Sequence, residues 1–167
     1  SWWRKRFGKL EDYFDCFRID HILGFFRIWE VPLDYVQGLC GHFNPALPLT
    51  PNEIEQYGLG FDEARLTTPH INREFLPELF GDRTEEVIGT FLAQSSSRHF
   101  VLKPYCDTQR KVEALFAGKT DEVSLRIKKG LFAIANEVLF LRDPREPDKF
   151  HPRISASQSY LYRELSA

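Results

Sequence analysis

Cysteine is scarce in this chain of 167 residues, and its cysteines are far apart in the sequence. The three are Cys16, Cys40 and Cys106, and no two of them form a Cys-x-x-Cys pair. An odd number at such spacing supports neither a disulfide framework nor a zinc knuckle. We therefore expect a protein of a reducing compartment, the cytoplasm.

Long apolar runs and an excess of charge of one sign are also lacking. No uninterrupted apolar run approaches the ~20 residues that span a bilayer, and the N-terminal stretch SWWRKRFGKL has no apolar core of signal-peptide length. The formal net charge is -2, without the basic excess that bulk nucleic-acid binding requires. We therefore expect no membrane and no nucleic-acid partner. The chain begins without Met, in what reads as mid-helix, so we expect a piece of a longer protein.

The histidines show no metal-binding spacing. His42, His70, His99 and His151 lie too far apart in the sequence to form a ligand motif, and nothing in the pattern predicts that they converge in space. We expect no metal and no cofactor. Aromatic residues, in contrast, reach 14%. A Phe-rich core accounts for this content, and a stacking surface for planar or sugar rings is the alternative.

The N-terminal part of the chain reads as one helix followed by one strand. Apolar residues at 3- to 4-residue spacing predict an amphipathic helix over residues 2–14, and a short apolar strand is predicted over 15–19. A helix followed by a strand that ends in polar residues is typical of a βα-repeat. Residues 38–51 then read as a Gly- and Pro-rich loop.

The remaining sequence predicts short helices with few strands. Helix starts are predicted at Thr50, Asn72, residue 83, Asp107, Asp121 and near residue 156. The apolar pattern after Asp121 leaves helix and strand partly open. A strand is predicted over 138–144, with a pairing segment near 151–155. The chain is thus expected to be mostly α-helical with a few short strands.

The polar end of the predicted strand is the candidate site. In α/β folds, catalytic groups lie at the carboxyl ends of strands, the place of Asp20 and His21. Strand alternation puts Arg18 and Asp20 on one face, with Cys16 a layer deeper in the core. The Arg18 guanidinium would keep the Asp20 carboxylate ionised, as the nucleophile of glycosyl transfer must be. A salt bridge that only ties the strand end to a neighbour is the structural alternative.

Two further side chains suit a sugar ligand. His21 can donate a hydrogen bond to a sugar hydroxyl, and Trp29 can offer an apolar platform to a pyranose ring. A nearby aromatic face and an ionised carboxylate together favour carbohydrate chemistry.

The motif order resembles the 4-α-glucanotransferases, the amylomaltase or disproportionating-enzyme family of the α-amylase superfamily. In that family the fourth strand of a (β/α)8 TIM barrel ends in Arg-x-Asp-His, followed by Gly-Phe and then Trp-Glu-x-Pro. The matching residues are Arg18, Asp20, His21, Gly24-Phe25 and Trp29-Glu30-Val31-Pro32, preceded by Trp2-Trp3-Arg4-Lys5-Arg6. The resemblance covers residues 2–32.

The resemblance implies an α/β parent fold and a retaining transfer between α-1,4-glucans through a covalent glycosyl-Asp intermediate. Asp20 would be the nucleophile, Arg18 would keep it ionised, and His21 and Trp29 would contact an α-glucan or maltooligosaccharide. The family's Glu-Asp-Leu-Gly and Thr-His-Asp segments do not follow the Arg18-x-Asp20-His21 motif in this sequence. We therefore expect residues 1–47 to be a barrel segment and 48–167 a helical insertion between barrel strands 4 and 5, as in the plant-cytosolic and Bacteroides-type branch.

The chain alone is then expected to be inactive, because the acid/base Glu and the remainder of the barrel lie elsewhere. The alternative is a non-catalytic helical module for carbohydrate binding or protein interaction, in which the Arg18–Asp20 pair is structural. The sequence leaves the oligomeric state open.

Overall fold

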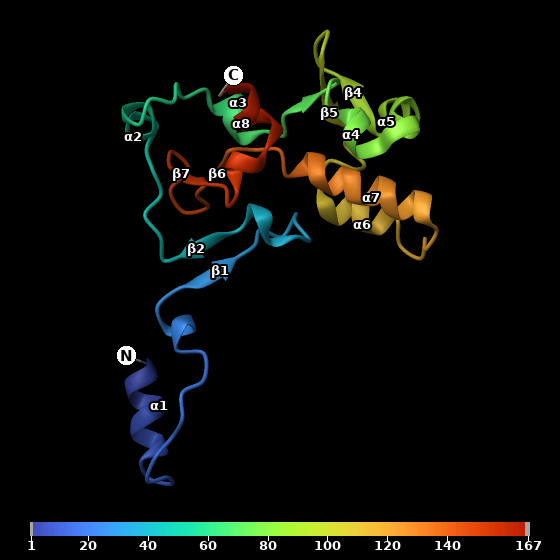
Figure 1. The fold of residues 1–167 in the computed structure, drawn as a ribbon. Helices are drawn as coiled ribbons and strands as arrows, with labels where there is room; N and C mark the ends of the chain where they lie inside the picture. The colour runs from blue at the N-terminus through green and yellow to red at the C-terminus, as the bar shows by residue number, and fades with distance from the viewer. Residues whose placement is uncertain (1, 166–167) are drawn as a thin grey trace.

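The computed structural model describes residues 2–165, which form short helices and short strands (Figure 1). The helices are α1 (Trp2–Leu10), α2 (Pro51–Gln56), α3 (Glu63–Thr67), α4 (Leu76–Phe80), α5 (Thr84–Phe91), α6 (Gln109–Leu115), α7 (Glu122–Ala135) and α8 (Tyr160–Leu165). The strands are β1 (Ile28–Glu30), β2 (His42–Asn44), β3 (Ile71–Asn72), β4 (Leu92–Gln94), β5 (His99–Leu102), β6 (Phe140–Arg142) and β7 (Phe150–Pro152). No helix within residues 2–165 has both the length and the apolar character needed to cross a bilayer.

The strands form three small antiparallel sheets. β1 pairs with β2, with Trp29 opposite Phe43. The second sheet has the order β3-β5-β4, and the third is the β6–β7 pair, which Leu49 extends through backbone hydrogen bonds to Phe150. The predicted pairing of 138–144 with the segment near 151–155 is confirmed in the third sheet, where Phe140 lies opposite Pro152.

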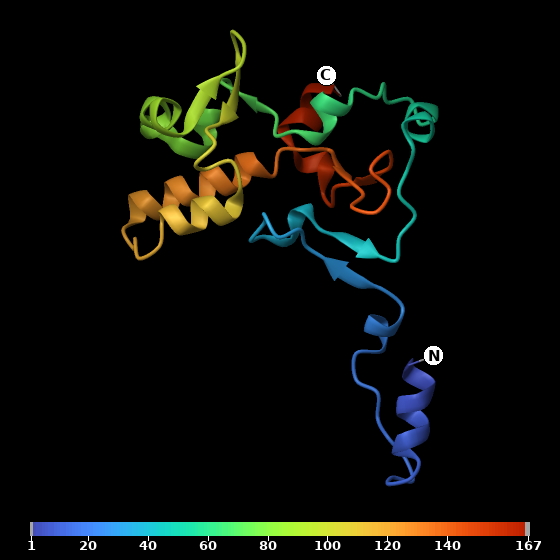
Figure 2. The same ribbon diagram turned by 180° about the vertical axis from the view of Figure 1, so that it is seen from behind.

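The N-terminal arm, residues 2–27, extends away from the rest of the molecule in both views (Figures 1 and 2). Aromatic rings hold α1 against the segment that follows it: the centroids of Phe7 and Phe17 are 5.0 Å apart, and those of Trp3 and Phe25 are 4.6 Å apart. No residue of α1 is buried. Much of the arm's apolar surface is therefore exposed.

The strand predicted over residues 15–19 is not formed. These residues have no regular secondary structure, and Cys16, predicted in the core, is exposed. A strand requires a neighbour to pair with its backbone N–H and C=O groups, and the arm offers none. The predicted βα-repeat is thus present only as its helix, which ends at Leu10 rather than at residue 14.

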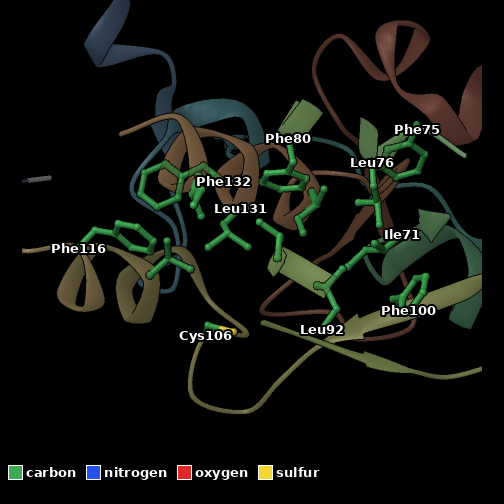
Figure 3. Packing of buried hydrophobic residues seen from close by; sticks show 14 residues of the cluster. Ile71, Phe75, Leu76, Phe80, Leu92, Phe100, Cys106, Phe116, Leu131 and Phe132 are labelled. Carbon is green, nitrogen blue, oxygen red and sulfur yellow. The ribbon is translucent and has the colours of Figure 1, made fainter. Parts of the chain in front are cut away.

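The main core lies between α4, α5, α6, α7 and the β3-β5-β4 sheet (Figure 3). It contains Ile71, Phe75, Leu76, Phe80, Val87, Leu92, Phe100, Cys106, Val112, Phe116, Ile127, Leu131, Phe132 and Ile134. A smaller cluster joins α2, α3, α8 and the β6–β7 pair through Ile54, Leu66, Leu139, Phe140, Phe150 and Leu161. All of the buried phenylalanines in the described part of the chain belong to these two clusters, as a Phe-rich core predicts.

Local capping signals placed two helix starts correctly, whereas α6 is capped by Thr108 and not by the predicted Asp107. Thr50 caps α2 in a reciprocal capping box with Glu53, and Asp121 caps α7 by accepting a hydrogen bond from the Ser124 N–H. The predicted start at Asn72 is wrong, because Asn72 pairs in β3 and α4 begins only at Leu76. The helix predicted over 83–94 ends at Phe91, where the chain enters β4.

A buried amide network docks the loop after β1 onto α6 and α7. The Gln109 side-chain oxygen accepts hydrogen bonds from the backbone N–H groups of Val36 and Gln37, at 2.8 and 2.9 Å. Its nitrogen donates to the Asn136 side-chain oxygen at 3.0 Å, and Asn136 in turn donates to the Gln37 side chain. The Cys40 thiol also donates to Asn136, and burial raises the pKa of this thiol to about 11, so it stays a neutral donor. The β1–β2 hairpin is thereby fixed to the helices.

The packing of the core against Gly130 can be tested by substitution. An added Cβ at Gly130 would overlap the Phe80 ring, whereas one at Gly89, also in a helix, meets nothing within 4 Å. We expect Gly130→Ala to lower the free energy of unfolding by roughly 1–3 kcal/mol through overpacking. Gly89→Ala should leave it unchanged or raise it by up to about 1 kcal/mol, because alanine is the better helix former. Urea denaturation measures both, and equal effects of the two changes would contradict this packing.

The amide network yields a second prediction. Gln109→Leu leaves the partly buried N–H groups of Val36 and Gln37 without an acceptor and removes a partner of the buried Asn136 side chain, so we expect a loss of roughly 1–3 kcal/mol of stability. Amide hydrogen exchange at Val36 and Gln37 should accelerate more than tenfold. The exposed Gln56→Leu is the matched control and should change neither quantity. Unchanged exchange at Val36 and Gln37 would exclude the network as the link between hairpin and helices.

Candidate functional site

The predicted site begins with an ion pair on the N-terminal arm. Arg18 donates to one Asp20 carboxylate oxygen from two nitrogens, Nη2 at 2.7 Å and Nε at 2.8 Å. The two side chains meet as predicted, although the strand that was expected to carry them is not formed. Both side chains are largely exposed, 86% for Arg18 and 75% for Asp20. An ion pair this exposed adds little stability.

His21 adopts a left-handed backbone conformation directly after the ion pair. Its φ and ψ are 56° and 51°, a region that non-glycine residues visit rarely. This residue starts the 3-10 turn Ile22–Phe25, in which the Gly24 N–H donates to the His21 carbonyl. A Cβ at Gly24 would lie 3.0 Å from the His21 ring, so the glycine allows the imidazole to fold back over the turn. Such conformations are concentrated at functional sites.

Trp29 lies further along, in β1, and is packed against its own hairpin. Its indole N–H donates to the Gly38 carbonyl at 3.0 Å, and its ring makes an edge contact with Phe43. A side chain at Gly41 would overlap the indole. The indole nitrogen is thus already engaged, so Trp29 can offer a ring face to a ligand but no hydrogen bond.

The structure therefore brings Arg18 and Asp20 into direct contact, sets His21 next to them in the chain, and places Trp29 in a separate hairpin. Sequence reasoning did not identify the side-chain contacts between the two strands of this hairpin. The Glu30 carboxylate, in the Trp-Glu-x-Pro motif, accepts a hydrogen bond from Asn44 at 2.6 Å and lies 3.9 Å from His42 Nε2. These contacts follow from the β1–β2 register, which no local sequence signal specified.

A hollow of about 340 Å³ lies elsewhere, between α3, α8 and the β3-β5-β4 sheet. Its charged groups are paired with each other: Glu164 lies 2.8 Å from His70 and 3.4 Å from Arg65. None of the predicted site residues lines it. It belongs to the packing of the helical region and not to the predicted site.

Comparison with known proteins gives consistent matches. A family model described as 4-alpha-glucanotransferase matches residues 1–136. The 4-alpha-glucanotransferase DPE2 of Oryza sativa subsp. japonica is 35% identical over 170 residues, covering 99% of this chain and 18% of the relative. The chloroplastic/amyloplastic 4-alpha-glucanotransferase of Solanum tuberosum is 41% identical over 60 residues, 35% of this chain and 10% of the relative.

A further match is the 4-alpha-glucanotransferase of Chlamydia trachomatis, 34% identical over 47 residues, 28% of this chain and 8% of the relative. The chain thus spans less than a fifth of the length of the rice relative and still less of the other two. No solved structure matches the chain significantly.

Proposed function

This chain belongs to the 4-alpha-glucanotransferase family, and on that premise we propose that it carries the nucleophile of a transfer between α-1,4-glucans. The observation that supports this most directly is the Arg18–Asp20 contact within the family's Arg-x-Asp-His motif. A carboxylate held by a guanidinium is the group that a retaining glycosyl transfer needs as its nucleophile.

In the proposed reaction, an Asp20 carboxylate oxygen attacks the anomeric carbon of the donor glucan. The bond from that carbon to the leaving O4 breaks, and the leaving oxygen takes a proton from an acid/base carboxyl. An acceptor 4-hydroxyl then gives its proton back to that group, attacks the glycosyl-Asp20 ester and releases the carboxylate. The acid/base carboxyl belongs to another part of the protein in this proposal.

Three neighbours have supporting roles. Arg18 orients the Asp20 carboxylate and pairs with its charge through two N–H donors. His21, set by its left-handed backbone, donates to a sugar hydroxyl. Trp29 presents its ring face to a pyranose, since its N–H is held by Gly38.

We propose that residues 1–47 are one segment of a (β/α)8 barrel and that residues 48–167 are a helical insertion. The exposed apolar surface of the arm supports a barrel assignment for residues 2–27, because residues such as Phe14, Leu23 and Phe26 are exposed here and would be buried by adjacent barrel strands. The remainder of the barrel would also pair with residues 15–19. The rice relative is more than five times longer than its match to this chain, which leaves room for such a barrel. A reducing cytoplasmic location remains a prediction.

The nucleophile is tested in the complete enzyme. Asp20→Asn should lower glucan transfer by several orders of magnitude while leaving glucan binding largely intact, because only the covalent step is lost. A fluorinated donor that traps the glycosyl-enzyme should label Asp20, as read by mass spectrometry of the digested protein. Glu11→Gln is the matched control, an exposed carboxylate on the same arm but outside residues 15–19, and should keep full activity. A sugar found on another carboxylate would overturn the assignment.

The role proposed for Arg18 is tested by asking whether its effect on the rate requires Asp20. Arg18→Ala should lower kcat roughly ten- to a hundredfold, the value of one or two hydrogen bonds to a charged group. In the Asp20→Asn background, the same change should cost almost nothing further, because the two residues act as a unit. Steady-state kinetics of the four enzymes in this cycle measure the coupling. Additive losses would mean that Arg18 acts independently of the nucleophile.

A further inference from the structure

Two histidines and an aspartate meet where the β1–β2 hairpin contacts the β6–β7 hairpin. The ring centroids of His42 and His151 are 4.4 Å apart, and Asp143 Oδ2 lies 2.7 Å from His151 Nε2. Each of the three residues offers a ligand atom, and these atoms all lie within 4.8 Å of one another. In the described part of the chain, no other group of three His, Cys, Asp or Glu side chains meets this condition.

The three side chains are almost closed to solvent. His42 is 11% exposed, Asp143 12% and His151 7%. A carboxylate and two imidazoles in such surroundings lose hydration, and that loss must be offset by specific partners. The existing hydrogen bond offsets it for Asp143 and His151, but His42 has only the stacked ring and the Glu30 carboxylate 3.9 Å away.

The protonation states of His42 and Asp143 suit the binding of a cation. Burial lowers the pKa of His42, and the neighbouring His151 lowers it further, so the ring is neutral at neutral pH and keeps a free lone pair. Burial acts to raise the pKa of Asp143, but hydrogen bonds from His151 and from backbone N–H groups outweigh it and leave that pKa lowered. A neutral imidazole and an ionised carboxylate are the forms that coordinate metal ions.

The carboxylates are held in place by a second layer of contacts. Asp143 Oδ1 accepts the backbone N–H groups of Arg145 and Glu146, both at 2.7 Å, which leaves Oδ2 directed at the histidines. Asn44 orients Glu30 from the other side. Such outer hydrogen bonds are characteristic of metal ligands. Arg145 is the nearby cation, but its guanidinium donates to Asn44, and the two carboxylates outweigh its charge.

From this geometry we propose that His42, Asp143 and His151 bind a divalent transition-metal ion, with Glu30 as the fourth ligand. Two imidazole nitrogens and two carboxylate oxygens suit Zn²⁺, whose bonds to such atoms are about 2.0–2.2 Å long in a tetrahedral arrangement. Binding draws the ligand atoms together and replaces the His151–Asp143 hydrogen bond, with the His151 proton on the other ring nitrogen. With Glu30, which lies 3.9 Å from His42 Nε2, the proposed site would be four-coordinate and closed, as structural zinc sites are.

The ion would join two segments that are distant in sequence. Glu30 and His42 lie in the β1–β2 hairpin, beside Trp29, whereas Asp143 and His151 come from the β6–β7 hairpin, which lies next to β2 in both views (Figures 1 and 2). It would fasten the outer end of the β1–β2 hairpin, as Gln109 fastens the loop between its strands. This inference depends on the side-chain cluster alone and not on the proposed transfer reaction.

The test uses the complete protein, freed of metal with a chelator and titrated with ZnCl₂ by isothermal calorimetry. We expect about one equivalent to bind at micromolar or tighter affinity and to raise Tm by several degrees. His42→Gln and His151→Gln should each weaken binding at least tenfold, and Asp143→Asn, which keeps the size of the side chain, should do the same. His99→Gln, a histidine outside the cluster, is the control and should bind as the parent does.

Co²⁺ provides a second readout, since a tetrahedral site with nitrogen ligands gives it a strong visible absorption that the three variants should lose. Binding that is unchanged in the variants, or no binding at tens of micromolar Zn²⁺, would overturn the proposal. A Tm loss in the variants that is equal with and without Zn²⁺ would also overturn it, since the cluster would then be only a stacked and hydrogen-bonded pair. Activity is not measured, so the outcome is separate from that of the Asp20 test.

Discussion

The buried amide of Gln109 is the contact on which the arrangement of this molecule depends. It accepts two backbone N–H groups from the loop after β1 and donates to α7 through Asn136. Gln109 and Asn136 are buried and the two N–H groups that Gln109 accepts are partly buried, so losing one partner would leave polar groups unpaired at a cost of about 1–3 kcal/mol for each buried one. The network is fully satisfied, and no buried side-chain nitrogen or oxygen within residues 2–165 lacks a partner. The hairpin that carries Trp29 is consequently part of the folded body, whereas the arm before it is not.

The arm and the body differ in what they bury. The helical region closes two apolar clusters, but α1 buries no residue, and the arm is held mainly by stacked rings such as Phe7 on Phe17. The Arg18–Asp20 pair is correspondingly exposed and stabilises little in water. The strength of this ion pair depends on low-dielectric surroundings, because charge interactions strengthen several-fold when water is excluded. The proposed barrel would supply those surroundings.

The β1–β2 hairpin connects the two proposals. Its first strand holds Trp29, proposed to face the glucan, and Glu30, proposed to face a metal ion, on alternate sides of the strand as the pleat requires. Movement of this hairpin would therefore affect both the proposed glucan contact and the proposed metal site. The Gln109 network at its loop and the His42–His151 stack at β2 restrain it at two points, which suits a segment that must keep an aromatic face in a fixed position.

The sequence by itself determined what depends on neighbours along the chain. Thr50 and Asp121 start helices because a capping side chain needs only the next three residues, and the order of Arg18, Asp20, His21 and Trp29 indicated the family. Tertiary structure decided what depends on distant partners. Residues 15–19 form no strand without a neighbour to pair with, and the strands β1–β5, of two to four residues each, left no periodic signal. His42 and His151 meet because two hairpins with separate registers lie side by side. The two histidines are more than a hundred residues apart in the sequence, and no motif spacing predicts a contact at that distance.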